Sequence, residues 1–137
     1  MLTNQKLFRG VEVATRFDEA GPAVFMDRDL LAQLVVNLVV NAAQAMDGMG
    51  RIIVTTEARR DTVFFSVADT GPGVPAEAAG RIFDPFFTTK PVGQGTGLGL
   101  SICHRIVEGE GGLIRLGRAE GTGAVFEIEL PRAKEEA

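Results

Sequence analysis

Short stretches of alternating or uninterrupted apolar residues predict β-strands along most of the chain. The polar residues 59–61 separate two of these stretches, which predicts an antiparallel hairpin. Residues 121–123, Gly-Thr-Gly, supply the turn between the last two stretches. The predicted strands cover residues 11–15, 23–26, 51–58, 62–68, 112–117 and 124–130.

A long helix is predicted from about residue 28 to residue 46. Asp27 stands at its N-cap position, and Gly48 and Gly50 follow its C-terminus. Amide side chains recur at every fourth position and therefore share one face of this helix. Buried amides without partners cost roughly 1–3 kcal/mol each, so this face needs partners. The amides are Gln33, Asn37 and Asn41.

Two interpretations of the amide face remain open. Core amides that bond nearby backbone groups would account for it. Alternatively, the amide oxygen of Asn41 is one neutral ligand of a magnesium ion, and phosphate oxygens and waters complete the octahedron. A neutral ligand suits a metal that already faces several phosphate charges.

A second amphipathic helix runs to about Glu108, with Ile102 and Ile106 on its apolar face. The start of this helix leaves backbone N–H groups unpaired and carries the positive end of the helix dipole, which makes it an anion site. The glycines there let phosphates approach the backbone. The glycine pattern fits neither G-x-x-x-x-G-K-[ST] nor G-x-G-x-x-G. Lys90 is the natural phosphate partner in this region, although lysines on loops are usually only solvated.

Asp69 follows the predicted hairpin and opens the sequence Asp-Thr-Gly-Pro-Gly. An aspartate in this setting forms turns through backbone hydrogen bonds. Alternatively, its carboxylate lies at the bottom of a pocket and accepts a hydrogen bond from an exocyclic amine. Residues 75–82 are compatible with a short helix, and core packing is the expected role of Phe83.

Composition narrows the classes of function. A chain of 137 residues with 45% hydrophobic content suits one domain. The net charge is −4, and Lys and Arg are scattered along the chain, so there is no basic patch of the kind that binds nucleic acid. Apolar runs stop well short of the ~18 residues of a membrane span. Cys103 is the single cysteine, and no secretory leader is recognised, so a reducing cytoplasm is expected. His104 is expected at the surface.

These stretches together resemble the ATP-binding catalytic domain of sensor histidine kinases, within the wider family of gyrase, heat-shock 90 chaperones and MutL proteins. QLVVNLVVNAAQAM is similar to its asparagine box, DTGPG to its first glycine box, FDPFFTTK to its phenylalanine box and GTGLGLSI to its second glycine box. The FFTTKPVGQGTGLGLSI segment is most similar to the nitrogen-regulation and dicarboxylate-sensing type of kinase.

The resemblance implies an α/β two-layer sandwich, the Bergerat ATP-binding fold. It has a mixed sheet of about five strands, three helices on one face, and a mobile ATP lid from about residue 74 to residue 97. The domain would span residues 11–131, with a connector remnant at 1–10 and a flexible tail at 132–137.

The resemblance also implies residue roles, with ATP and Mg²⁺ as ligands. Asp69 would bind the adenine amino group in a pocket shaped by Gly71 and Gly73. Asn41 would ligate Mg²⁺ and Lys90 would contact the terminal phosphate, and these two would carry the catalysis. The other positions expected at the ATP site are Asn37 beside the phosphates, Gln44, Ala45, Val74, Ile82, Phe83, Thr89, Gly95, Thr96, Gly97, Leu98, Gly99, Leu100 and Ala124.

Two features depart from the family pattern. Many members place a basic residue and then an adenine-stacking aromatic three and four positions after the magnesium asparagine, where this chain has Gln44 and Ala45. Adenine binding would then depend more on Asp69, with modest affinity. Ala124 replaces a threonine that often assists the aspartate through water, although Thr122 is close.

The family carries its phosphoacceptor histidine on a separate dimerising hairpin, and His104 cannot take that role. The resemblance therefore implies an isolated, monomeric catalytic domain that donates the γ-phosphoryl group of ATP to a histidine on a separate domain in two-component signalling. A response regulator would be an indirect partner. The domain would act in the cytoplasm, alone or as the cytoplasmic part of a membrane-anchored sensor, without membrane or nucleic-acid contact.

Two other functions fit the same boxes. One is a serine kinase of the anti-sigma-factor type, which uses them on a short chain. The other is a nucleotide-binding module or ATPase of this family that has no kinase activity.

Overall fold

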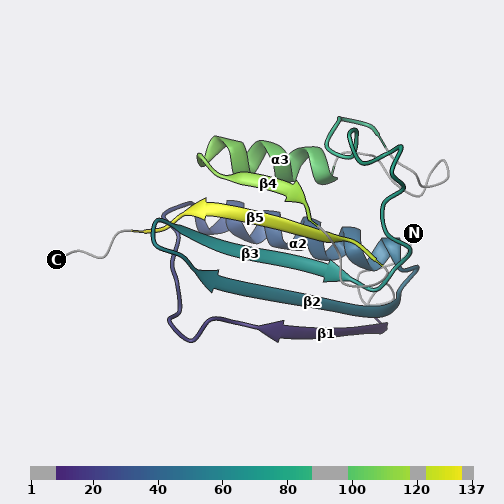
Figure 1. Cartoon of the computed structure of the whole chain (residues 1–137), viewed down its shortest axis with the longest axis horizontal. Helices are drawn as coiled ribbons and strands as arrows, with labels where there is room; N and C mark the ends of the chain where they lie inside the picture. The colour runs from purple at the N-terminus through teal and green to yellow at the C-terminus, as the bar shows by residue number, and fades with distance from the viewer. Residues whose placement is uncertain (1–8, 88–98, 118–122, 134–137) are drawn as a thin grey trace.

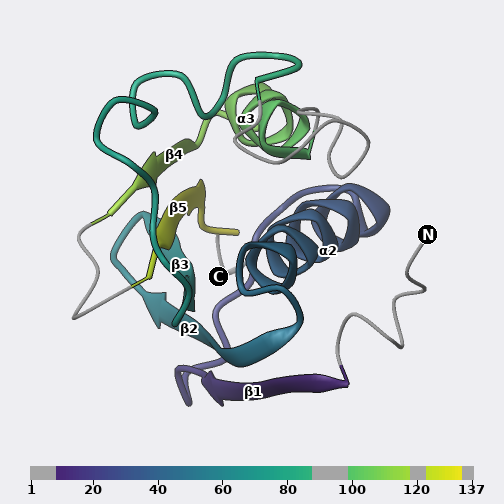
Figure 2. The same cartoon turned by 90° about the vertical axis from the view of Figure 1, so that its right-hand side faces the viewer.

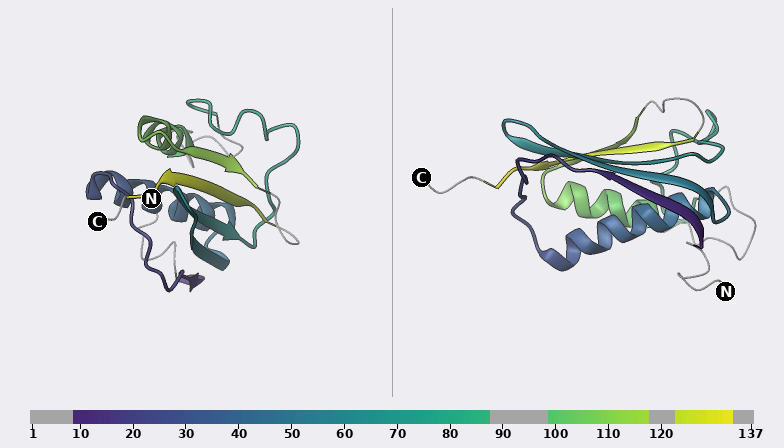
Figure 3. Two further views of the ribbon diagram at one scale, coloured as in Figure 1. Left: turned by 60° about the vertical axis from the view of Figure 1, so that its left-hand side comes forward. Right: turned by 90° about the horizontal axis from the view of Figure 1, so that it is seen from below.

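The computed structural model describes residues 9–87, 99–117 and 123–133. Its strands form one five-stranded sheet in the order β1-β2-β3-β5-β4. Both helices of the described ranges cover the same face of this sheet, which gives a two-layer α/β sandwich (Figures 1, 2 and 3). The elements are β1 (Gly10–Arg16), α2 (Arg28–Ala45), β2 (Met49–Ala58), β3 (Thr62–Asp69), α3 (Gly99–Gly109), β4 (Leu113–Leu116) and β5 (Val125–Pro131).

The sheet is mixed because its strands are connected in two ways. β1 and β2 pair in parallel, and α2 supplies the crossover connection that parallel neighbours need. β2 and β3 form the predicted antiparallel hairpin, in which the N–H of Arg59 donates to the carbonyl of Thr62 at 2.9 Å. β5 then pairs antiparallel with both β3 and β4.

The boundaries of α2 follow the predicted caps. The Asp27 carboxylate accepts hydrogen bonds from the N–H groups of Asp29 at 2.7 Å and Leu30 at 3.3 Å, which satisfies donors that a helix start otherwise leaves unpaired. At the other end, Gly48 has a φ of 76° and donates to the carbonyl of Ala43 at 3.0 Å. Gly50 lies within β2.

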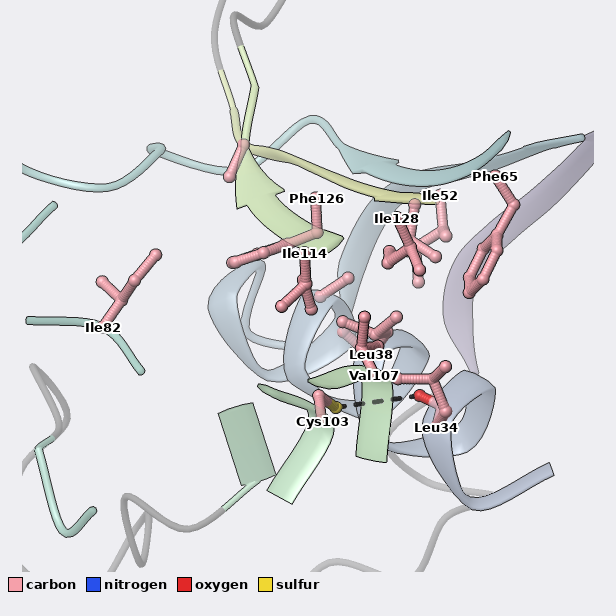
Figure 4. Packing of buried hydrophobic residues seen from close by; sticks show 14 of the residues in the cluster. Leu34, Leu38, Ile52, Phe65, Ile82, Cys103, Val107, Ile114, Phe126 and Ile128 are labelled. Carbon is pink, nitrogen blue, oxygen red and sulfur yellow. Dashed lines mark hydrogen bonds between the residues drawn. The ribbon is translucent and has the colours of Figure 1, made fainter. Parts of the chain in front are cut away.

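The core fills the space between the sheet and the two helices (Figure 4). Leu34 and Leu38 of α2 are fully buried against the sheet and α3, and each such side chain stabilises the fold by about 1.5–3 kcal/mol. The thiol of Cys103 points at the carbonyl of Leu34, 3.9 Å away. Burial raises the pKa of Cys103 to about 12, so this thiol stays protonated and serves packing.

The strand predicted at residues 23–26 is wrong. Only Val24 makes a β-bridge there, to Arg132. The side chains of Val24 and Met26 still pack against the core. The run is too short to extend a ladder, because Pro22 precedes it and Asp27 already caps α2.

Residues 75–82 form consecutive turns and not the short helix that the sequence suggested. The N–H groups of Ala78 and Ala79 both donate to the carbonyl of Pro75, at 2.9 and 3.1 Å, and the turns continue to Phe87. Gly80 explains the difference, because glycine in a helix interior disfavours helix. Within the described residues, two helices cover the sheet. Neither is long and apolar enough to cross a membrane.

Candidate functional site

Three helix and strand ends meet at one end of the sandwich. The C-termini of β3 and α2 and the start of α3 all lie on the right in Figure 1. Asp69 ends β3, Asn41 lies in the last turns of α2, and Gly99 begins the described part of α3. The fold thus brings together residues that the sequence places far apart.

Asp69 is the most buried charged residue of this region, with 7% of its surface exposed. Its Oδ1 accepts hydrogen bonds from the N–H of Gly71 at 2.9 Å and the N–H of Ala124 at 3.3 Å. Among the described residues, no donor bonds its other oxygen, Oδ2. One edge of the carboxylate is therefore fixed by the backbone.

Burial raises the pKa of Asp69 above its usual 3.8, against the opposing effect of the Gly71 and Ala124 N–H groups. Because the folded-state pKa is raised, the stabilising contribution of Asp69 is present below the unfolded pKa and is lost as pH rises through the folded pKa. At neutral pH the ionised Asp69 carboxylate is therefore less stable in the folded protein than in water. A donor that reaches Oδ2 would offset that cost.

Glycines allow the backbone around Asp69 to pack closely. A Cβ on Gly71 would lie 3.0 Å from Asp69 Oδ1 and 3.3 Å from the carbonyl oxygen of Ala45. Gly73 has a φ of 83°, and a Cβ there would lie 2.8 Å from the carbonyl oxygen of Gly123. The first glycine box therefore packs against both the end of α2 and the turn before β5.

Ala124 contributes through its backbone. It accepts from the N–H of Asp69 at 2.9 Å as well as donating to the Asp69 side chain. An alanine is sufficient for both bonds, which explains how the position expected to hold a threonine still supports the carboxylate. Gly123 precedes it with a φ of 106°, a backbone angle that side chains rarely permit.

The amide face of α2 is shorter than predicted, because Gln33 is exposed to solvent. Asn37 and Asn41 are half-buried. The Nδ2 of Asn37 is buried and has no hydrogen-bond partner among the described residues. An unpaired buried amide costs about 1–3 kcal/mol, so this nitrogen fits a ligand that brings acceptor oxygens.

Asn41 lies one turn further along the same face of α2. In the described ranges, no group of three or more His, Cys, Asp or Glu residues is arranged to hold a metal. A Mg²⁺ ion beside Asn41 would take further oxygen ligands from a phosphate-bearing molecule and water. The amide oxygen of Asn41 fits that donor set.

Some of the residues predicted for the lid pack against the core, and the others lie outside the described residues. Ile82 is 6% exposed, and Val74 and Phe83 pack against the core, which confirms the packing role of Phe83. The Phe83 ring lies 5.4 Å from that of His104. His104 is therefore not simply a solvated residue, and its Nε2 also lies 3.2 Å from Glu108 Oε1.

Other predicted positions are only partly placed. Gln44 and Ala45 are half-buried at the end of α2, and Gly99 and Leu100 are half-buried at the start of α3. The positions that lie outside the described residues are Thr89, Lys90, Gly95, Thr96, Gly97 and Leu98.

Sequence reasoning did not identify Met46, Thr70 or Gly123 as parts of this region. Met46 is 7% exposed beneath Gly71, and the Thr70 hydroxyl contacts its sulfur. Thr70 follows Asp69 within the DTGPG sequence, and this position is the only sequence feature that could have assigned it to the site. Nothing in the linear pattern pairs it with Met46.

The family profile described as "Histidine kinase-, DNA gyrase B-, and HSP90-like ATPase" matches residues 26–134. The sensor histidine kinase ZraS of Escherichia coli (strain K12) is 42% identical over 122 residues, which cover 88% of this chain and 26% of that protein. The sensory histidine kinase/phosphatase NtrB of Rhizobium leguminosarum bv. phaseoli is 35% identical over 143 residues, covering 93% and 37%. The chain thus spans well under half of these curated relatives.

Solved structures agree with the fold. The nucleotide-free catalytic domain of histidine kinase ThkA superposes with a TM-score of 0.79 at 40% identity, covering 90% of this chain and 81% of that one. Full-length ShkA in complex with AMPPNP gives a TM-score of 0.81 at 36% identity, covering 97% of this chain and 28% of that one.

Proposed function

Because the chain belongs to the family of histidine kinase-, DNA gyrase B- and HSP90-like ATPases, we propose that it binds ATP with Mg²⁺ and donates the γ-phosphoryl group to a histidine on a separate dimerisation and phosphoacceptor domain. The observation that carries this proposal is the buried Asp69 carboxylate. Gly71 and Ala124 bond one of its oxygens, and no described residue bonds the other.

Adenine presents the donor that this oxygen needs. Its exocyclic amine would donate to Asp69 Oδ2, while guanine carries a carbonyl oxygen at the equivalent ring position. Two acceptors would then face each other in a buried site, and sites built for a specific donor reject such ligands strongly. The half-buried Ala45 leaves no aromatic ring at the position where many family members stack one on the base.

The phosphates would lie between α2 and α3. Asn37 Nδ2, which has no partner among the described residues, would donate to a phosphate oxygen, and Asn41 would hold Mg²⁺. The backbone N–H groups at the start of α3, together with Lys90, would add positive potential there. Mg²⁺, when bound, supplies charge neutralisation, and phosphoryl transfer depends mainly on such neutralisation and on positioning.

In the transfer step, an imidazole nitrogen of the acceptor histidine forms a bond to the γ-phosphorus as the bond to the bridging oxygen breaks. ADP leaves with that electron pair. The residues of this chain hold the donor in line, and the acid or base beside the histidine belongs to the other domain. The phosphohistidine would then supply a response regulator; the relative ThkA is also known in complex with the response regulator protein TrrA.

A mixing experiment tests the transfer. The chain is incubated with γ-labelled ATP, Mg²⁺ and the dimerisation and phosphoacceptor hairpin of ZraS. Label that is acid-labile and alkali-stable should appear on the hairpin, and a hairpin without its acceptor histidine should remain unlabelled. Acid-stable phosphoserine on an anti-anti-sigma protein would instead support the serine kinase. ATP binding without label on either acceptor would support a nucleotide-binding module.

Asn41→Ala should weaken binding of ATP in the presence of Mg²⁺ by about 10-fold or more, because a metal contact is lost. Binding of ADP without metal should change by less than about 2-fold, since no metal is then held. Isothermal titration with both ligands measures the two affinities. Gln33→Ala is the matched control on the same helix, because Gln33 is exposed. Equal losses for both ligands would show that Asn41 is only structural.

A further inference from the structure

We infer that Thr70, acting through Met46, is a positioning residue that fixes the direction of the Asp69 carboxylate and thereby sets the selectivity for a base with an exocyclic amine. This inference rests on the proposed function. Neither the resemblance nor the sequence pattern indicated the contacts that Thr70 makes with Arg51 and Met46.

The Thr70 hydroxyl connects three separate parts of the chain. It accepts a hydrogen bond from the N–H of Arg51 at 3.0 Å and donates to the sulfur of Met46 at 3.6 Å. Arg51 lies near the start of β2, and Met46 is the C-cap of α2. The residue directly after Asp69 is thereby tied to both elements that surround it.

Met46 passes this restraint on to the carboxylate. A Cβ on Gly50 would lie 2.5 Å from the Met46 sulfur, and a Cβ on Gly71 would lie 3.1 Å from its Cγ. The thioether is therefore enclosed between two glycines that leave it little freedom. Gly71, which rests on it, donates the 2.9 Å hydrogen bond that fixes Asp69 Oδ1.

Adenine recognition would depend on this restraint, because the proposed site uses the Asp69 carboxylate to recognise the exocyclic amine. Position 45 carries alanine, so a stacking ring is absent there. If the Asp69–Gly71 turn shifted, Oδ2 would leave the line of the exocyclic amine, and hydrogen bonds weaken steeply with misalignment. Thr70 itself is exposed. We therefore expect its hydroxyl to matter for selectivity more than for the stability of the fold.

The test compares ATP with purine riboside triphosphate, which lacks the exocyclic amine. Thr70→Val keeps the shape of the side chain but removes the hydroxyl. Its affinity for ATP should fall about 3- to 10-fold, the effect of one hydrogen bond, while the affinity for the analogue stays unchanged. Thr70→Ser should restore ATP affinity, because it keeps the hydroxyl oxygen.

Met46→Leu provides an independent variant, since it keeps a side chain of similar volume but replaces the sulfur with a branched hydrocarbon. It should reproduce the selective loss, and combining it with Thr70→Val should add little, as expected for residues that act through one contact. Isothermal titration of the wild type, the three single variants and the double variant against both ligands supplies the data. Additive losses, or equal losses for ATP and the analogue, would overturn the inference.

Asp69→Asn, measured in the same experiment, separates this inference from the proposed function. A loss of ATP affinity in Asp69→Asn without a selective loss in Thr70→Val would show the inference to be wrong while the nucleotide site stands. An Asp69→Asn variant that binds ATP normally would overturn both.

Discussion

Asp69→Asn is expected to weaken ATP binding by about 10- to 150-fold, the range that a hydrogen bond to a charged group of about 1.5–3 kcal/mol corresponds to. The variant should fold, because an amide oxygen can still accept from Gly71 and Ala124. Its free energy of unfolding at pH 7 should equal or exceed that of the wild type, since burial disfavours the ionised carboxylate. Isothermal titration and urea denaturation measure the two quantities.

The pH dependence provides an internal control for this prediction. The affinity of the wild type for ATP should fall as pH falls through the raised pKa of Asp69, because the protonated acid is a poorer acceptor. Asp69→Asn should lack that dependence. Asp61→Asn, on the exposed β2–β3 turn, should bind ATP like the wild type. Wild-type affinity in Asp69→Asn would contradict the assignment of Asp69 to the base.

Gly123→Ala is expected to lower the free energy of unfolding by about 3 kcal/mol, from strained backbone and steric overlap together. Gly123 has a φ of 106°, and a Cβ there would overlap the backbone oxygen of Asp69. The turn would have to move, and it would carry the N–H of Ala124 away from the carboxylate. Urea denaturation should show a lower midpoint, and ATP affinity should fall in parallel.

Gly80→Ala is the matched control for the glycine variant. A Cβ on Gly80 would meet no atom within 4 Å, so its free energy of unfolding should change by less than about 0.5 kcal/mol, as for other surface substitutions. If Gly123→Ala proved as stable as Gly80→Ala, the tight packing between the turn and Asp69 would have no energetic consequence.

The sequence predicted the elements whose signals are local. Asp27 marks the start of α2 because an N-cap acts within one turn, and residues 59–61 mark the hairpin because they directly join its strands. The strand predicted at residues 23–26 was wrong for a physical reason. Val24 and Met26 are apolar because they pack against the core from a loop, and periodicity cannot distinguish that from a short strand.

At the candidate site, the sequence could predict only the contacts between residues of the same motif. Asp69 and Gly71 come from one segment and bond each other, so their association follows from the DTGPG sequence. Gln33 shares the predicted face of α2 but is exposed, because helical spacing predicts a face and not how deeply it is buried. The contact of Thr70 with Met46 joins residues 24 positions apart, and only the folded chain reveals it.

Thermal denaturation with a non-hydrolysable ATP analogue tests the nucleotide site most directly. The chain is heated with Mg²⁺ and AMPPNP, and in parallel with Mg²⁺ and the guanine analogue GMPPNP. At about 100 times the dissociation constant, AMPPNP should stabilise the wild type by about 2.7 kcal/mol, and GMPPNP at the same concentration should have little effect. An absence of stabilisation by AMPPNP, or equal stabilisation by both analogues, would contradict an adenine-specific site at Asp69.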